Sequence, residues 1–187
     1  KFYFTPGDTG FKVWDTAYGK LGVGICWDQW FPETARCLAV NGADIILYPT
    51  AIGSEPILDC DSKGHWQRCM QGHSAGNVIP VVAANRVGLE SVSPSPENGN
   101  QQSELNFYGS SFITDATGAI IKEAGREEET VIAASFDFDE IRKELDEVRN
   151  DLIYNSSAMS EEERKCLKLR KEELKSLLKK EGNNNGR

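Results

Sequence analysis

The sequence predicts an α/β fold in which helices cover one face of a sheet, followed by a helical hairpin. Short apolar, β-branched runs alternate with helical patterns in the first half of the chain, which is typical of strand–helix–strand units with parallel strands. Beyond residue 138, apolar residues recur at spacings typical of amphipathic helices. With 187 residues, 39% of them hydrophobic, the chain is long enough for one domain with its own core.

The first half of the chain carries clear start and stop signals. Tyr18-Gly-Lys20 has the composition of a hairpin turn, and Pro32 stands at the first turn of a helix, where its missing N–H costs little. Asn41-Gly42 ends that helix, and the next strand should run parallel to the preceding one through a right-handed crossover. The expected elements are strands at 11–15 and 21–25, a helix at 33–40, a strand at 43–48, a helix from 61 or 62 to 76 and a strand at 78–84.

The second half of the chain changes to short strands joined by turns, which would give the sheet an antiparallel end. Residues 91–104 are polar and rich in proline, asparagine and glycine, which predicts a mobile surface loop. The expected strands are 107–114, 119–122 and 130–136. A helix follows from Asp139, and Ser160-Glu-Glu-Glu163 is a capping-box start for a second one. These boundaries predict a domain over 1–138, an amphipathic helical extension over 139–181 and a disordered tail over 182–187.

The composition argues against several classes of function. The formal net charge is −8 and no basic patch stands out, so a nucleic-acid partner is not expected. No apolar run approaches the ~20 residues that span a membrane, and the N-terminus has no signal-peptide pattern. The sequence therefore predicts a cytoplasmic protein without a membrane partner. The five cysteines lack C-x-x-C spacing and suggest neither disulfides nor a zinc site, and no cofactor is expected.

Cys26 lies between the end of a predicted strand and the start of a predicted helix. Such a turn can leave a sulfur exposed, place it near backbone N–H groups and activate it, all of which a nucleophilic thiol needs. Free cysteines are also commonly buried and inert. By position alone, therefore, Cys26 is either a nucleophile or a small buried hydrophobic residue.

The residues around Cys26 favour the nucleophile. Gly24-Ile-Cys-Trp-Asp-Gln-Trp-Phe-Pro-Glu33 resembles the nucleophile motif of the nitrilase (carbon–nitrogen hydrolase) superfamily, most closely that of its N-carbamoylputrescine amidohydrolase branch. Further segments resemble that branch in the same order, over roughly residues 1 to 142: Phe2-Tyr-Phe-Thr-Pro-Gly-Asp-Thr-Gly10, Tyr48-Pro-Thr-Ala-Ile-Gly-Ser-Glu-Pro56, His65-Trp-Gln-Arg-Cys-Met-Gln-Gly-His73, Ala84-Asn-Arg86 and Phe107-Tyr-Gly-Ser-Ser-Phe112. The resemblance implies the second half of a nitrilase-type αββα sandwich, which makes 1–138 a partial carbon–nitrogen hydrolase domain.

The resemblance also implies hydrolysis of a linear carbamoyl or amide C–N bond through a cysteine thioester. The favoured substrate is N-carbamoylputrescine, a small cationic carbamoyl-amine, which would yield putrescine, carbon dioxide and ammonia. Cys26 would attack the carbonyl, with the Trp27 backbone N–H as an oxyanion donor. The family's base glutamate, oxyanion lysine and second glutamate would all precede Lys1. The chain is therefore expected to be inactive alone, and the full-length form to be a homo-oligomer.

Two other interpretations stay open. One is a catalytically inactive binding or scaffold protein, which keeps half of the fold and recruits a partner through the helical segment after Asp139. In the other, a separate chain supplies the catalytic groups that the resemblance places before Lys1. Alkylation of Cys26 without turnover would favour the inactive scaffold protein. Co-purification of a second chain would favour the interpretation in which that chain supplies the catalytic groups.

Five residues are candidate substrate contacts. Relatives that act on carbamoyl amino acids carry basic residues after the motif's aspartate, whereas this chain has Gln29 and Trp30, which disfavours a substrate with a carboxylate. The loop after the strand at 43–48 should reach the same end of the sheet as Cys26. That loop adds Thr50, Ala51 and Glu55, the last either as a partner for a substrate ammonium or as an ordinary solvated glutamate.

Other ionisable residues near the motif are expected to be structural. His65 and His73 are the only imidazoles, and both belong to the predicted helix that carries Trp66. Glu33 stands where negative charge suits a helix N-terminus. Lys20 lies at the other end of a strand of roughly 17 Å from the nucleophile and is too far away to take part.

Overall fold

The computed structural model of the chain describes residues 7–54 and 60–154, with side chains described as far as residue 148. The predicted second helix of the hairpin, the tail over 182–187 and Glu55 lie outside the described residues. The described chain forms two sheets and three α-helices. None of the described helices is long and apolar enough to cross a membrane.

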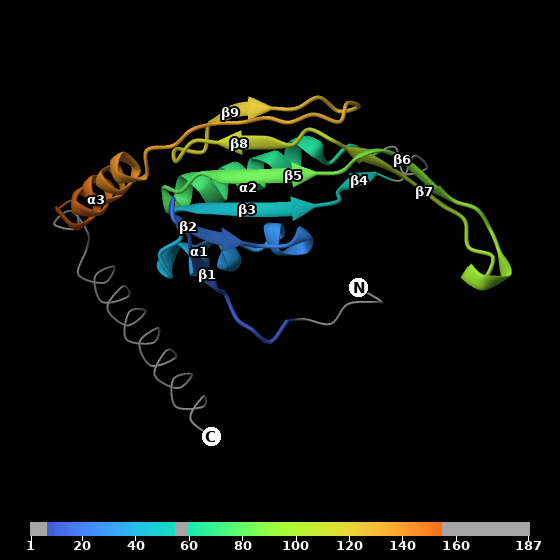
Figure 1. Cartoon of the computed structure of the whole chain (residues 1–187), viewed down its shortest axis with the longest axis horizontal. Coiled ribbons are helices and arrows are strands. Elements are labelled where there is room, and N and C mark those ends of the chain that lie inside the picture. The colour runs from blue at the N-terminus through green and yellow to red at the C-terminus, as the bar shows by residue number, and fades with distance from the viewer. Residues whose placement is uncertain (1–6, 55–59, 155–187) are drawn as a thin grey trace, which may run out of the picture. The chain divides into compact units, whose positions relative to one another are not determined.

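The larger sheet has six strands in the order β1-β2-β3-β5-β8-β9 (Figure 1). They are β1 (Val13–Asp15), β2 (Lys20–Val23), β3 (Ile45–Thr50), β5 (Val81–Asn85), β8 (Phe112–Thr114) and β9 (Ile120–Glu123). β2, β3 and β5 are parallel, and the outer strands pair antiparallel. The helices α1 (Pro32–Val40) and α2 (Lys63–Asn77) share one core with the sheet. The predicted α/β sheet with an antiparallel end is confirmed.

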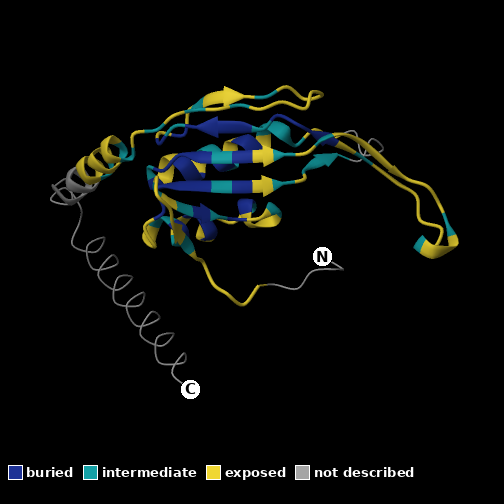
Figure 2. Ribbon diagram, in the orientation of Figure 1, coloured by how far each residue is buried: buried dark blue, intermediate teal, exposed yellow. Residues whose placement is uncertain are grey.

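The hydrophobic core lies between these two helices and the sheet (Figure 2). Alternate residues of β3 and β5 point into it, as the period of two in a strand requires. The central members are at most 1% exposed: Leu38, Ile46, Tyr48, Trp66, Met70, Val81, Ala83 and Phe112. The Trp66 ring meets the Phe112 ring edge-on, with the ring centroids 5.2 Å apart, a favoured aromatic arrangement.

Two helix ends explain where the neighbouring elements begin. Pro32 is the first residue of α1, as predicted, and Gly42 follows that helix with a φ of 90°. The strand predicted from Val78 begins only at Val81. Val78 takes a left-handed φ of 53° at the C-cap of α2, and its N–H donates to the Ala75 carbonyl. Because this backbone group closes the helix end, Val78 cannot join the sheet.

The segment predicted as a mobile loop, 91–104, belongs in part to a β-hairpin. β6 (Val87–Val92) and β7 (Ser103–Tyr108) pair antiparallel, and β4 (Gly53–Ser54) pairs with the other edge of β7. The two long strands extend as a ribbon whose tip is exposed (Figures 1 and 2). The loop prediction was wrong at both ends of the segment 91–104, where the residues belong to strands. A ribbon exposed on both faces needs no alternation of apolar and polar residues, so these strands have no recognisable strand pattern in the sequence.

Two further strand predictions need correction. The predicted strand 107–114 is interrupted at Gly109 and Ser110, whose φ values of 56° and 52° turn the chain, so that β7 and β8 belong to different sheets. The predicted strand 130–136 is absent. Its residues alternate between exposed and half-buried, but they pair with no described strand. An extended segment without a neighbour for its backbone groups does not form a sheet strand.

The helix predicted from residue 139 is present as α3 (Phe138–Tyr154). Asp139 and Glu140 lie in its first turn, where negative charge is favourable. Contacts within the chain divide it into the units Lys1–Ile141 and Arg142–Arg187. The domain boundary proposed at residue 138 stays a prediction.

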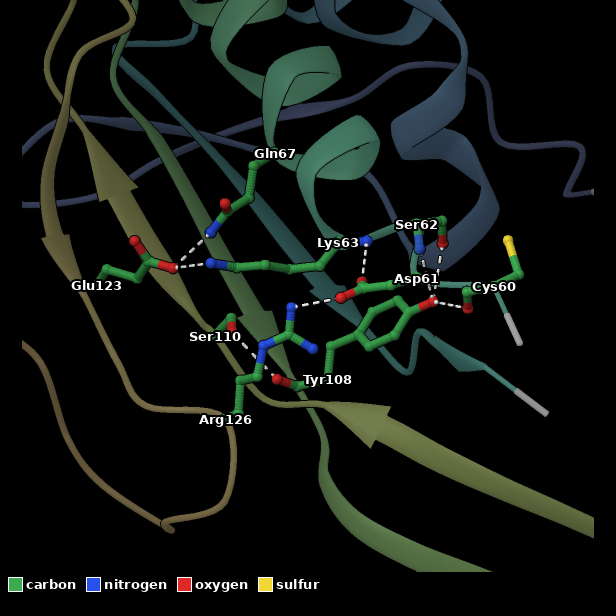
Figure 3. Close-up of polar contacts among 9 residues, drawn as sticks. All are labelled: Cys60, Asp61, Ser62, Lys63, Gln67, Tyr108, Ser110, Glu123 and Arg126. Carbon is green, nitrogen blue, oxygen red and sulfur yellow. Dashed lines mark hydrogen bonds and ion pairs between the residues drawn. The ribbon is translucent and has the colours of Figure 1, made fainter. Parts of the chain in front are cut away.

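A polar cluster fastens the start of α2 to β9 and the loop that follows it (Figure 3). Lys63 Nζ lies 2.6 Å from Glu123 Oε1, and Gln67 Nε2 donates to the same oxygen at 2.9 Å. Arg126 Nη2 donates to the Asp61 carboxylate at 2.7 Å. Burial by itself raises the pKa of Glu123, but Lys63 and Gln67 together lower it below its usual value.

A second, buried network ties α2 to β5 and β8. Thr114 Oγ1 donates to Ser74 Oγ at 2.9 Å and accepts from the Val81 backbone N–H at 3.0 Å. The single proton of Ser74 Oγ is shared between the backbone carbonyls of Ile79 and Asp115, which lie 2.8 and 2.7 Å from this oxygen. Ser74 and Thr114 are 0% exposed. Removing one hydroxyl therefore leaves buried groups without partners.

We expect Glu123→Gln to weaken the dependence of stability on acid. Because the folded pKa of Glu123 is lowered, its contribution to the free energy of unfolding is present above the unfolded pKa of about 4.3 and is lost as the pH falls through the folded pKa. The side chain is 36% exposed, so the effect stays below about 1 kcal/mol. Urea unfolding at neutral and acidic pH measures it, with the exposed Glu127→Gln as control. Identical acid sensitivity of wild type and E123Q would contradict the assignment.

We expect Thr114→Val to destabilise the chain by about 1–3 kcal/mol, because this nearly isosteric change leaves the Val81 N–H unpaired in the core. The matched control is Thr130→Val at an exposed position, for which a change below about 0.5 kcal/mol is expected. Urea denaturation followed by circular dichroism gives both values. Equal stability of the two variants would show that the buried network contributes nothing.

Candidate functional site

Cys26 lies beyond the end of β2, at the edge of the sheet where the parallel strands end. Because β2, β3 and β5 are parallel, the segments that follow them meet at this edge. β2 ends at Val23, earlier than predicted, and Cys26 opens the short 3₁₀-helix η1 (Cys26–Trp30), which leads into α1. The φ of Cys26 is 51°, a left-handed conformation that costs a non-glycine residue about 1 kcal/mol. Such strain persists only where the surroundings enforce it.

Gln29 anchors the 3₁₀-helix that Cys26 opens. Gln29 Nε2 donates to Thr50 Oγ1 at 3.0 Å, and Gln29 Oε1 accepts from Trp66 Nε1 at 2.7 Å. The backbone carbonyl of Gln29 lies 2.9 Å from His73 Nε2. Gln29 is 1% exposed. The residue thus connects η1 to the end of β3 and to α2, through bonds that are shielded from water.

A close contact beneath η1 depends on Gly24. A Cβ on Gly24 would lie 2.6 Å from Cε1 of Tyr48, so any larger residue would displace this buried ring. The Tyr48 hydroxyl is buried and has no hydrogen-bond partner among the described residues. Burial raises the pKa of Tyr48, and the charge of Asp28 raises it further, so the phenol stays protonated. The sequence analysis did not identify Tyr48 as part of the site.

Cys26 opens onto a pocket of about 350 Å³, within the size range of small-molecule sites. The lining residues come from η1, the segment after β3 and the start of α2: Cys26, Trp27, Gln29, Trp30, Ala51, Ile52 and His65. The structure thus gathers most of the candidate residues around one cavity. Thr50 is not a wall residue but is bonded to one, and Glu55 lies outside the described residues.

His65 and Ile52 are wall residues that the sequence analysis missed. The imidazole of His65 stacks on the Trp30 ring, with centroids 5.4 Å apart and planes inclined by 22°. His65 was expected to be structural because it belongs to the Trp66 helix. Neighbouring helical residues point in different directions, however, so Trp66 enters the core while His65 faces the pocket.

Asn85 positions the Ile52 side of the pocket. Its Oδ1 accepts from the Ile52 N–H at 2.8 Å, and its Nδ2 donates to the Ile52 carbonyl at 3.0 Å. The same nitrogen lies 2.9 Å from the Gly109 carbonyl. Asn85 therefore holds the segment after β3 much as a neighbouring strand would. Asn85 belongs to the Ala84-Asn-Arg86 motif, but no role was predicted for it from the sequence.

The remaining ionisable candidates lie away from the cavity or are engaged elsewhere. Lys20 pairs with Asp15 at 3.3 Å at the start of β2, the end far from Cys26. Glu33 is exposed in the first turn of α1, as predicted. No lysine, arginine or carboxylate is among the described residues that line the pocket. No group of three or more potential metal ligands occurs in the described part of the chain.

The sequence was compared with protein families and with known proteins. The carbon–nitrogen hydrolase family model matches residues 1–143. A citrullinase from Francisella tularensis is 57% identical over 145 residues, which are 77% of this chain and 48% of that protein. An N-carbamoylputrescine amidase from Solanum tuberosum is also 57% identical, over 76% of this chain and 46% of the enzyme. The chain thus spans about half the length of these relatives.

Solved structures show the same fold. A carbon–nitrogen hydrolase from Helicobacter pylori is 38% identical with a TM-score of 0.66, over 81% of this chain and 55% of that one. A mutant of the amidase from Nesterenkonia sp. AN1, which shows covalent addition of the acetamide moiety of fluoroacetamide at the active site cysteine, is 27% identical with a TM-score of 0.51, over 66% of this chain and 40% of that one. From the family match and these likenesses, the chain belongs to the carbon–nitrogen hydrolase family.

Proposed function

We propose that the protein contributes the nucleophile to hydrolysis of a terminal carbamoyl-amine, with N-carbamoylputrescine as the substrate. The observation that carries this proposal is the position of Cys26, strained and in the wall of a small-molecule pocket, within a chain of the carbon–nitrogen hydrolase family. Two further findings support it: the relative from Solanum tuberosum is an N-carbamoylputrescine amidase, and an amidase of similar fold carries a covalent adduct on its active site cysteine.

In the proposed reaction the Cys26 thiolate attacks the carbamoyl carbon, and the tetrahedral intermediate collapses with loss of an amine. Water then hydrolyses the resulting carbamoyl thioester, which frees the Cys26 thiol and a carbamic acid. The carbamic acid breaks down to carbon dioxide and the second amine, so that the products are putrescine, carbon dioxide and ammonia. The Trp27 backbone N–H is the proposed oxyanion donor, because it belongs to the residue next to the nucleophile. Cys26 and Trp27 both line the cavity, and Gln29 ties the 3₁₀-helix that carries them to β3 and α2, which supports these roles.

The reaction also needs a proton acceptor and a cation near the oxyanion. No described lining residue is a carboxylate or a lysine. We therefore propose that the glutamates and lysine implied by the family resemblance act from residues preceding Lys1, and that the 187-residue chain does not turn over alone. Assembly of full-length subunits into a homo-oligomer is part of the same proposal.

A second candidate substrate is citrulline, because a citrullinase is as similar to this chain as the Solanum tuberosum amidase. Both compounds end in a ureido group on an aliphatic chain, and citrulline differs by a carboxylate at the other end. A carboxylate is usually bound by arginine or lysine. The described pocket wall has neither, so we favour the substrate without a carboxylate.

We expect iodoacetamide to alkylate Cys26 before Cys37 and Cys69 in the native chain. Burial raises the pKa of the Cys69 thiol, which slows its reaction. Cys60 is exposed and serves as the reference for an accessible thiol without a pocket. Peptide mapping by mass spectrometry after limited treatment measures each rate. Cys26 should also react faster than Cys60, and preferential labelling of Cys37 or Cys69 would argue against Cys26 as the nucleophile.

We expect the 187-residue chain to release no ammonia from N-carbamoylputrescine above background. Loss of general acid–base catalysis typically lowers the rate by ~10²–10⁴, and loss of one oxyanion group lowers it by ~10²–10³. The two losses need not multiply, because the groups act as a unit, but either one brings turnover near background. A longer protein that carries the family's glutamates and lysine before Lys1 should be active, and Cys26→Ala should abolish that activity while Cys37→Ala should not. Turnover by the short chain at the rate of the longer protein would refute this mechanism.

A further inference from the structure

We propose that the Trp30 ring, held by His65, binds the distal ammonium of the substrate through a cation–π contact while Cys26 attacks the carbamoyl carbon. This inference rests on the proposed function and adds the basis of substrate selection. Its starting point is the chemistry of the pocket wall. The described lining residues include three aromatic rings, those of Trp27, Trp30 and His65, and no carboxylate.

The one amide side chain in the described wall is committed to the protein. Gln29 Nε2 donates to Thr50, and Gln29 Oε1 accepts from Trp66, in a residue that is 1% exposed. Gln29 thus acts on the position of η1 and not on a ligand. The wall can also attract a cation through the negative π-face of an aromatic ring, and tryptophan provides the strongest such attraction.

The orientation of the Trp30 ring is fixed from two sides. Trp30 packs against the hydrophobic core, and its ring stacks on His65 with a centroid separation of 5.4 Å. Rings in contact have planes about 3.5–4 Å apart, so this separation implies a lateral offset of about 4 Å. Part of the indole face is therefore left uncovered by His65. A ring that does not have to be immobilised on binding contributes more of its attraction to affinity.

The spacing along η1 matches the length of the substrate. A 3₁₀-helix rises about 2.0 Å per residue, so Trp30 lies about 8 Å along the axis from Cys26. In N-carbamoylputrescine six bonds separate the carbamoyl carbon from the ammonium nitrogen, an extended span of about 7 Å, equal to two residues of extended chain. A substrate whose carbamoyl carbon contacts the Cys26 sulfur can thus place its ammonium at the Trp30 ring.

The test measures how well three ligands protect Cys26 of the 187-residue chain from iodoacetamide. N-carbamoylputrescine carries the ammonium, N-butylurea is its neutral counterpart, and citrulline carries a carboxylate as well. Peptide mapping reports Cys26, with exposed Cys60 as the internal control for reagent activity. We expect N-carbamoylputrescine to protect at a concentration about 2- to 30-fold lower than N-butylurea, the range of a cation–π contact. Citrulline should protect least.

Substitutions locate the effect. Trp30→Leu should remove the advantage of N-carbamoylputrescine over N-butylurea, and Trp30→Phe, which keeps a weaker π-face, should retain part of it. Trp14→Leu, at a half-exposed tryptophan on β1 at the opposite end of β2, should change nothing. Circular dichroism confirms that each variant is folded. If W30L is unfolded, W30F and the wild-type comparison of the two ligands decide the matter.

The outcomes separate this inference from the function on which it rests. If none of the three ligands protects Cys26, either in the 187-residue chain or in the longer protein that carries the family's glutamates and lysine, the pocket is not a carbamoyl-amine site and the proposed function fails with the inference. If N-carbamoylputrescine and N-butylurea protect wild type equally, the pocket binds the ureido group and only the role of Trp30 is refuted. An advantage for the cationic ligand that persists in W30L also refutes that role.

Discussion

The geometry of the site depends on the buried amide of Gln29. A buried amide without partners would cost roughly 2 kcal/mol or more, so its side chain has to meet both a donor and an acceptor. Trp66 supplies the donor and Thr50 the acceptor. The short 3₁₀ segment η1 is closed locally by the bond from the Ile25 N–H to Asp28 Oδ2 at 2.8 Å, and the bonds of Gln29 tie it to β3 and α2. Cys26, with its left-handed backbone, is the first residue of this anchored segment.

The parallel strands explain why residues far apart in the chain reach one cavity. β2, β3 and β5 all end at the same edge of the sheet, so η1, the Ala51–Ile52 segment and Asn85 follow one another there. Asn85 then bonds the backbone of Ile52, which fixes the segment after β3 in the pocket wall. The described wall is aromatic and uncharged. Such a wall is suited to positioning a substrate.

Local patterns predicted the elements that bury an apolar face. The continuous apolar runs at β3 and β5, and the helical spacing of Trp66 and Met70, reflect the need to fill one core. The same patterns failed where no face is buried or no partner is present. The ribbon of β6 and β7 is polar because its outer part is exposed, and 130–136 looks like a strand but pairs with no described strand.

The sequence by itself determined the α/β character of the chain and the identity of Cys26 as the candidate nucleophile, because both depend on residues that are close together in the chain. Only the tertiary structure decided the role of Gln29, since its partners Thr50, Trp66 and His73 are 21, 37 and 44 residues away. The same is true of His65, whose contact with Trp30 arises only when α2 packs beside η1. Local sequence sets which elements can form, whereas side-chain partners across the fold set what each polar group does.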